Sequence, residues 1–229
     1  MSAAPLDLAD AGTGAAGPVK PRLRGVLHEV AFFVWLVAGT WLVWTAPTAG
    51  SAAVLAVYVV SVAALFGVSA LFHRHHWGSV GRRRMRRLDH STIFLAIAGS
   101  YTAVVGISLS GWPRTLELSI VWIGAAVGIT LRQVWLDAPK WVIALPYVVV
   151  GWSALVVFPE LVHALGGAGT ALLVAGGVAY SAGAAVYAAK KPDPVPGVFG
   201  YHEVFHACTI VGAVLHFVLI AWIVVPLAG

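Results

Sequence analysis

Charged residues are scarce in this sequence. Only 10% of its 229 residues are Asp, Glu, Lys or Arg, and 60% are hydrophobic, whereas soluble domains carry about 25% charged residues. So few charges cannot cover the water-facing surface of a chain this long, which excludes an ordinary soluble protein and a disordered chain. There is a single cysteine, Cys208, so an intrachain disulfide framework is excluded as well. The remaining class is a polytopic membrane protein.

The sequence is instead rich in long hydrophobic stretches. Beyond Lys20 they recur with lengths of about 18 to 25 residues, enough for a helix to cross ~30 Å of hydrocarbon. Prolines such as Pro47 and Pro113 separate them, at positions where a missing backbone N–H does least harm. We therefore predict an all-α fold, a bundle of seven transmembrane helices within residues 22–229. The predicted spans are about 26–46, 51–72, 89–110, 116–136, 141–158, 168–189 and 202–226.

The basic residues predict how this bundle is oriented. With seven spans, thirteen of the fourteen Lys and Arg residues fall on one side of the membrane, and only Arg114 falls on the other. The thirteen are Lys20, Arg22, Arg24, Arg74, Arg82, Arg83, Arg84, Arg86, Arg87, Arg132, Lys140, Lys190 and Lys191. By the positive-inside rule this side is cytoplasmic, so we expect a multi-pass cell-membrane protein with its N-terminus inside and its C-terminus outside. Residues 1–21 lack the basic start and apolar core of a signal peptide and are predicted to form a disordered cytoplasmic tail.

Five arginines stand together between residues 82 and 87. We interpret this run mainly as a solvated loop that sets the topology, with contact to anionic lipid headgroups as a further consequence. Binding to nucleic acid is not expected, because no folded soluble module or aromatic-lined groove accompanies the run.

Ionisable and polar residues gather near the cytoplasmic ends of four predicted spans. Polar side chains are costly in hydrocarbon unless they are satisfied, so such a gathering predicts a functional site. The residues are His28 and Glu29 in the first span, Ser69 and His73 at the second, Asp89 and His90 in the third, and Tyr201, His202, Glu203 and His206 at the seventh.

Residues 202–206 read H-E-x-x-H, the zinc motif of metalloproteases. His202 and His206 are four residues apart, so on a helix their rings project from one face and can share a metal ion. An open zinc site also needs a third protein ligand and a position for water. His73 is the best candidate for that ligand, while Asp89 could orient or deprotonate the water and Ser69 could hydrogen-bond either of them. The alternative is a pair of helix-interface histidines bonded to their neighbours.

Three motifs in order along the chain resemble the hemolysin III family, the bacterial branch of the progestin and adiponectin receptor (PAQR) superfamily. They are the S-x-x-x-H of residues 69–73, the L-D-H-S of residues 88–91, and the H-x-x-x-H of residues 202–206 with L-H-F at 215–217. The resemblance covers residues 22–226 and implies a seven-helix bundle with an intracellular N-terminus. It also implies a zinc ion bound by His73, His202 and His206, with Asp89 and Ser69 in contact with the zinc-bound water.

The sequence departs from that family pattern at three positions. His90 stands where the receptors commonly have tyrosine, and Ala103 stands where bacterial members often have proline. Glu203 stands where the receptors often have glutamine, so the family's zinc site does not need it, although it offers a second general base.

Two functions are consistent with these residues. The first is a zinc-dependent hydrolase of a lipid amide or ester, similar to a ceramidase, with Asp89 accepting a proton and a lipid-like substrate inside the bundle. The second is a non-enzymatic lipid sensor or membrane-homeostasis protein whose structural zinc ties the second and seventh spans together. An intramembrane metalloprotease with Glu203 as its base, and a pore-forming haemolysin, rank below these. His216 lies ~15 Å along the helix from His206 and is expected to form an interhelical hydrogen bond.

Overall fold

The computed structural model describes residues 20–229, so the tail predicted over residues 1–21 lies almost wholly outside the described residues. Between residues 20 and 229 the chain forms seven α-helices and, apart from an isolated bridge between Val195 and Phe199, no β-structure. The prediction of an all-α fold is confirmed. The helices are α1 (Val26–Trp44), α2 (Ala49–Arg74), α3 (Ser79–Ser108), α4 (Gly111–Val134), α5 (Lys140–Gly151), α6 (Phe158–Ala189) and α7 (Tyr201–Leu219). The short 3-10 helix η1 (Ser153–Val157) joins α5 to α6, and η2 (Ile220–Val224) and η3 (Val225–Ala228) extend α7.

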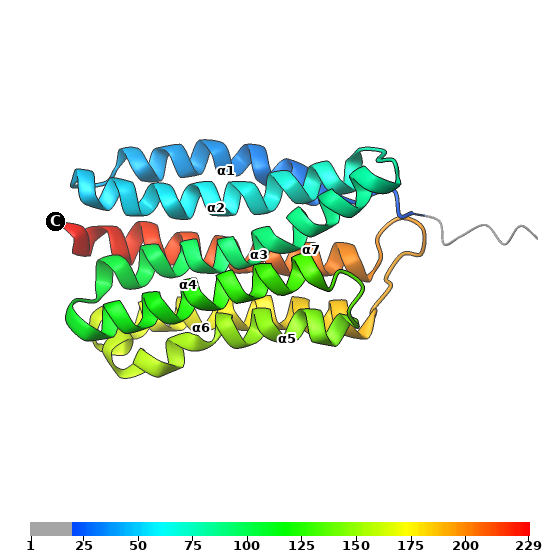
Figure 1. The fold of residues 1–229 in the computed structure, drawn as a ribbon. Helices are drawn as coiled ribbons and strands as arrows, with labels where there is room; N and C mark the ends of the chain where they lie inside the picture. The colour runs from blue at the N-terminus through cyan, green and yellow to red at the C-terminus, as the bar shows by residue number, and fades with distance from the viewer. Residues whose placement is uncertain (1–19) are drawn as a thin grey trace, which may run out of the picture.

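The helices run up and down in one bundle (Figure 1). The beginning of α1 and the α2–α3, α4–α5 and α6–α7 connections lie at one end of the bundle, which we call the basic end. The C-terminus lies at the opposite, far end. Thirteen of the fourteen Lys and Arg residues belong to helix ends and connections at the basic end, so the charge asymmetry read from the sequence is also an asymmetry of the folded bundle.

The outward faces of the helices are apolar. α1 buries only four of its 19 residues, and large side chains such as Phe33, Val37 and Trp41 remain exposed. A belt of this kind is stable in lipid rather than in water, where it would drive aggregation. The chain is therefore a multi-pass membrane protein, as predicted.

Within residues 20–229, six helical segments are long and apolar enough to cross a membrane. α5 has only 12 residues, about 18 Å in length, and with η1 and α6 it forms the single long segment Ala144–Ala189. Pro146 lies inside α5, and the helix ends at Gly151. The count of seven membrane crossings therefore stays a prediction, because the fifth crossing is divided between a short helix and a 3-10 turn.

Two helices begin well before the hydrophobic stretches that predicted them. α3 begins at Ser79, ten residues before the predicted span, so the arginine run is helical and its interpretation as a loop was wrong. α6 begins at Phe158 rather than 168 and is interrupted at Gly166, whose φ of 64° few other residues adopt. Hydropathy marks where a helix meets hydrocarbon, whereas its backbone hydrogen bonds continue into the polar boundary.

Small residues allow the helices to pack closely. Gly99 of α3 faces Ser61 of α2, and Gly128 of α4 faces the ring of Phe94 on α3. A Cβ atom at either glycine would overlap its neighbour. Close contacts of this kind are typical of helix packing in lipid, where burial of apolar surface adds little.

Candidate metal centre

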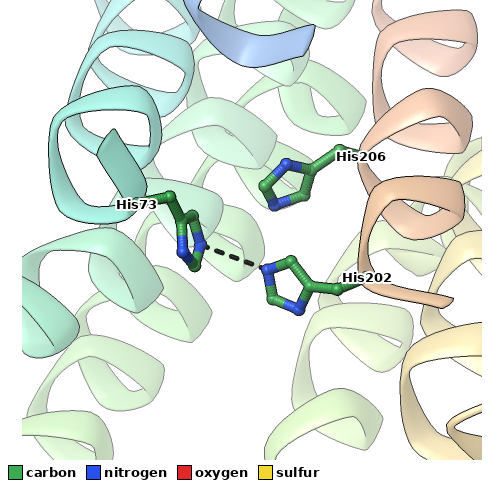
Figure 2. Close-up of side chains that lie close together, drawn as sticks. All are labelled: His73, His202 and His206. Carbon is green, nitrogen blue, oxygen red and sulfur yellow. Dashed lines mark hydrogen bonds between the residues drawn. The ribbon is translucent and has the colours of Figure 1, made fainter. Parts of the chain in front are cut away.

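Three histidines from two helices meet at the basic end of the bundle (Figure 2). His73 lies in the last turn of α2, and His202 and His206 lie in the first two turns of α7. One ring nitrogen of each lies within 4.8 Å of the other two, and the Nε2 atoms of His73 and His202 are 3.1 Å apart. Nitrogens bound to one tetrahedral zinc ion would be ~3.4 Å apart. The fold thus brings the three predicted ligands together in a group that could hold one metal ion.

The segment that precedes α1 holds the His73 end of this group. Lys20 donates a hydrogen bond from Nζ to the main-chain carbonyl of His73. This carbonyl is in the last turn of α2, where helical carbonyls have no partner within the helix. Main-chain hydrogen bonds of 3.1 and 3.2 Å also join residues 22–23 to residues 197–198, just before α7. The same short segment therefore contacts the end of α2 and the connection that leads into α7.

Both carboxylate oxygens of Glu203, the acidic residue of the H-E-x-x-H motif, have partners outside the histidine group. It is 1% exposed, its Oε1 forms an ion pair with Arg24, and its Oε2 accepts a hydrogen bond of 2.8 Å from the main-chain N–H of Gly200. The second contact caps the start of α7. Glu203 does not line the cavity that contains His202 and His206. This geometry favours Glu203 as an anchor of α7 rather than as a base.

Asp89 and Ser69 line a cavity that also contains His202 and His206. Both are buried, on α3 and α2 respectively. Along α7 the cavity extends from His202 to His216, ~21 Å of helix. Asp89 is not part of the group of side chains that could share the ion. The carboxylate and the hydroxyl therefore line the same cavity as two of the three histidines.

The cavity is mostly apolar and is lined mainly by residues of helices α2, α3, α5, α6 and α7. Leu65, Ile93, Ile97 and Val148 contribute to its wall. His216 lines its inner part and forms a hydrogen bond of 3.2 Å between its Nε2 and the carbonyl oxygen of Leu173 on α6. The predicted interhelical hydrogen bond of His216 is therefore present.

His28 is a further group at this site. Its ring stacks on that of His206, with centroids 3.8 Å apart and planes inclined by 7°. It is buried on α1 and lines the same cavity as Asp89. The sequence places His28 among the polar residues near the cytoplasmic end of the first span, and the structure shows that it lines the cavity. His28 thereby adds α1 to the helices that form the site.

His90 forms a hydrogen bond with Arg132, one of the thirteen basic residues that the sequence assigned to the cytoplasmic side. Arg132 is buried, and its Nη2 lies 2.9 Å from Nδ1 of His90 and 2.9 Å from the carbonyl oxygen of Leu136. Because a guanidinium can only donate, Nδ1 of His90 accepts this hydrogen bond. The hydroxyl of Tyr147 donates to the main-chain carbonyl of His90 at 3.1 Å. No sequence signal distinguished this buried arginine from the exposed ones.

The donor set suits zinc. Imidazole nitrogens are preferred zinc ligands, and three of them leave a fourth tetrahedral position for water or substrate. The three histidines could therefore hold a divalent ion.

Comparison with known proteins agrees with the motifs. A family model described as Haemolysin-III related matches residues 17–217. The chain is 33% identical over 182 residues to Hemolysin-3 of Bacillus cereus, an alignment that covers 80% of each chain. It is 28% identical over 201 residues to a Hemolysin-3 homolog of Bacillus subtilis (strain 168), covering 85% of this chain and 89% of the relative. Together with the lipid-facing helices, this match identifies the chain as a member of the hemolysin III family of bacterial multi-pass membrane proteins.

Proposed function

We propose that this protein is a zinc-dependent hydrolase that cleaves an amide or ester bond of a membrane lipid. The observation that supports the proposal best is the group of three histidines beside a cavity that also contains Asp89 and Ser69. His73, His202 and His206 would hold the ion. When bound, zinc acts as a Lewis acid and lowers the pKa of its water to about 7.

The residues of the chain have separate tasks in this reaction. The carboxylate of Asp89 accepts a proton as water attacks the lipid carbonyl, and it then delivers the proton to the leaving nitrogen or oxygen. The hydroxyl of Ser69 orients the reacting groups from the opposite helix. The apolar wall of the cavity holds the acyl chain and keeps bulk water away from the carbonyl.

The topology that goes with this function is seven crossings, with the basic end in the cytoplasm. It is supported by the thirteen basic residues at that end and by the C-terminus at the far end (Figure 1). The metal centre would then lie near the cytoplasmic leaflet. Alkaline phosphatase fused after Gly229 should be active outside the cytoplasm, and activity of a cytoplasmic fluorescent reporter at the same position would contradict this orientation.

The central test compares wild type with Asp89→Asn. Both proteins are purified in lipid nanodiscs, their zinc content is measured, and release of fatty acid from a ceramide and from a phospholipid is followed by mass spectrometry. We expect zinc in both, and turnover that falls by about 10²–10⁴-fold in the variant, the usual contribution of a general base. Asp137→Asn is the matched control, because this exposed carboxylate lies at the same end and pairs with Arg86 at 2.9 Å. Zinc in both proteins with no turnover in wild type would refute the hydrolase proposal.

A lipid sensor with a structural zinc is the second candidate. One observation favours it: His73 belongs to the histidine group but does not line the cavity, so the ion would also act as a clasp between α2 and α7. In that case zinc removal would separate the two helices, and the protein would release no fatty acid with or without zinc. The same purified wild-type protein tests both candidates, because only the hydrolase releases fatty acid.

The two remaining alternatives are weaker. A metalloprotease would need Glu203 as its base, but both carboxylate oxygens of this residue have other partners. A pore would need a polar path to the far end of the bundle. Buried apolar side chains such as Leu42, Leu55, Val105 and Ile220 instead pack together in the main core.

A further inference from the structure

Four basic side chains gather next to the metal centre. They come from three separate segments: Lys20 and Arg24 before α1, Arg74 at the end of α2, and Arg82 near the start of α3. We call these four residues the basic cluster. Only one of them belongs to the arginine run 82–87, so the cluster is a product of the fold.

Two members of the cluster contact the main chain of a histidine of the metal centre or the residue next to one. Lys20 donates to the main-chain carbonyl of His73. Arg24 pairs with Glu203, the residue that follows His202. A ligand that engages this cluster would therefore act on both helices that carry the histidines.

The other two members lie at the outer edge. Arg74 pairs through Nε with Oε2 of Glu29 at 2.9 Å, and both side chains are largely exposed. The guanidinium of Arg82 lies 5.8 Å from the ring centroid of Phe72, a cation–π distance. Among residues 20–229 no carboxylate pairs with Arg82, so its guanidinium is available to an anion.

The cluster has an excess of positive charge. Glu29 and Glu203 offset two of its four cations, which leaves two uncompensated. Positive charge is therefore concentrated beside His73, and an anion placed among these side chains would offset it.

The surroundings of the cluster match the headgroup level of a membrane. Leu71, just before Arg74, and Val80, just before Arg82, are exposed apolar side chains. Trp77 lies between them in the chain, and its indole N–H donates to the main-chain carbonyl of Leu71 at 3.3 Å. Tryptophan is enriched at this depth, where an apolar ring meets polar headgroups. Exposed apolar side chains thus accompany the cluster at the α2–α3 connection.

We propose that the basic cluster is a binding site for the phosphate of an anionic phospholipid from the leaflet at the basic end. The phosphate binds Lys20 and Arg82, and the acyl chains lie on the apolar surface near Leu71 and Val80. The bound lipid thereby secures the segment that holds His73 and α7, and so supports the metal centre. This inference is independent of whether the site hydrolyses a lipid.

The experiment measures lipid binding directly. Purified protein in detergent is titrated with phosphatidylglycerol, with phosphatidylcholine and with inorganic phosphate, and bound lipid is counted by native mass spectrometry. The variant is Lys20→Gln/Arg82→Gln, and the matched control is Arg83→Gln/Arg84→Gln, which removes two exposed charges from the same helix end. Lys20 and Arg82 would each contribute roughly fivefold by contacting the phosphate, so phosphatidylglycerol should bind about 25-fold more weakly to the variant. The control should stay within about twofold of wild type, because Arg83 and Arg84 lie outside the basic cluster.

Two results would overturn the proposal. Equal weakening in both double variants would show diffuse attraction by the whole basic end rather than a site. Inorganic phosphate that binds as tightly as phosphatidylglycerol would show a soluble anion as the ligand. If the double variant does not fold, Lys20→Gln alone should weaken binding about fivefold, and an unchanged affinity would refute the proposal. This assay measures lipid binding and not turnover. Its outcome is therefore independent of the outcome of the Asp89→Asn experiment.

Discussion

Replacing Glu203 by glutamine separates the two roles that this residue could have. As an anchor, Glu203 neutralises Arg24 and caps α7, whereas as a base it would take a proton during turnover. Glutamine keeps an oxygen that can accept from the N–H of Gly200 but has no charge. The variant therefore removes the ion pair selectively and leaves the cap available.

The size of the effect follows from burial. Glu203 is 1% exposed and Arg24 is 19% exposed, so the substitution leaves a mostly buried guanidinium without its carboxylate. Breaking a buried pair by removing one partner costs about 3–5 kcal/mol, and the partial exposure of Arg24 places this case near 3 kcal/mol. For a chain of this size, 1 kcal/mol corresponds to about 2–4 °C, so the melting temperature should fall by roughly 6–12 °C.

The assay combines thermal unfolding with turnover measured well below the melting temperature. We expect Glu203→Gln to lower stability but to keep most of the turnover and zinc of wild type. Glu29→Gln is the matched control, because its pair with Arg74 is 42% and 49% exposed and is worth only about 0–1 kcal/mol. The double variant Arg24→Gln/Glu203→Gln should be more stable than Glu203→Gln alone, since no unpaired charge remains. Unchanged stability together with abolished turnover would refute the anchoring role and restore Glu203 as a base.

Two further predictions concern the metal and the packing. His73→Ala should lose zinc. Zinc at a hundred times its dissociation constant should stabilise wild type by about 2.7 kcal/mol, but it should not raise the melting temperature of the variant. Full zinc occupancy in the variant, measured by plasma emission spectrometry, would exclude His73 as a ligand. Gly212→Ala should lower the free energy of unfolding by about 1–3 kcal/mol, because the new Cβ would lie 2.8 Å from the ring of Tyr180. Gly167→Ala, where a Cβ meets no atom within 4 Å, is its control, and equal melting temperatures for both variants would contradict the close packing of α6 and α7.

Much of the site could be predicted because short-range rules apply to it. The i, i+4 spacing of His202 and His206 places both rings on one helical face in any helix that contains them. The scarcity of charge identified lipid as the solvent, and the motif around His73 identified the third histidine by resemblance. These inferences need only the helical period, the hydropathy of the spans and the order of the motifs.

The partners of buried charges depend on tertiary contacts. Glu203 and Arg24 are 179 residues apart, and Arg132 and His90 are 42 apart, so no local pattern joins them. The helical state of the arginine run likewise follows from backbone hydrogen bonds that persist beyond the hydrocarbon boundary, where hydropathy carries no signal.

Composition and periodicity thus establish the solvent, the all-helical class and the face of the seventh span that carries His202 and His206. The packing of seven helices alone places His28 in the cavity, engages Glu203 with Arg24, and gathers four cations from three segments beside His73. The physical reason is that hydropathy and helical spacing are properties of single segments, whereas the choice between a ligand, a base and an anchor depends on which side chains another segment brings within a few ångströms.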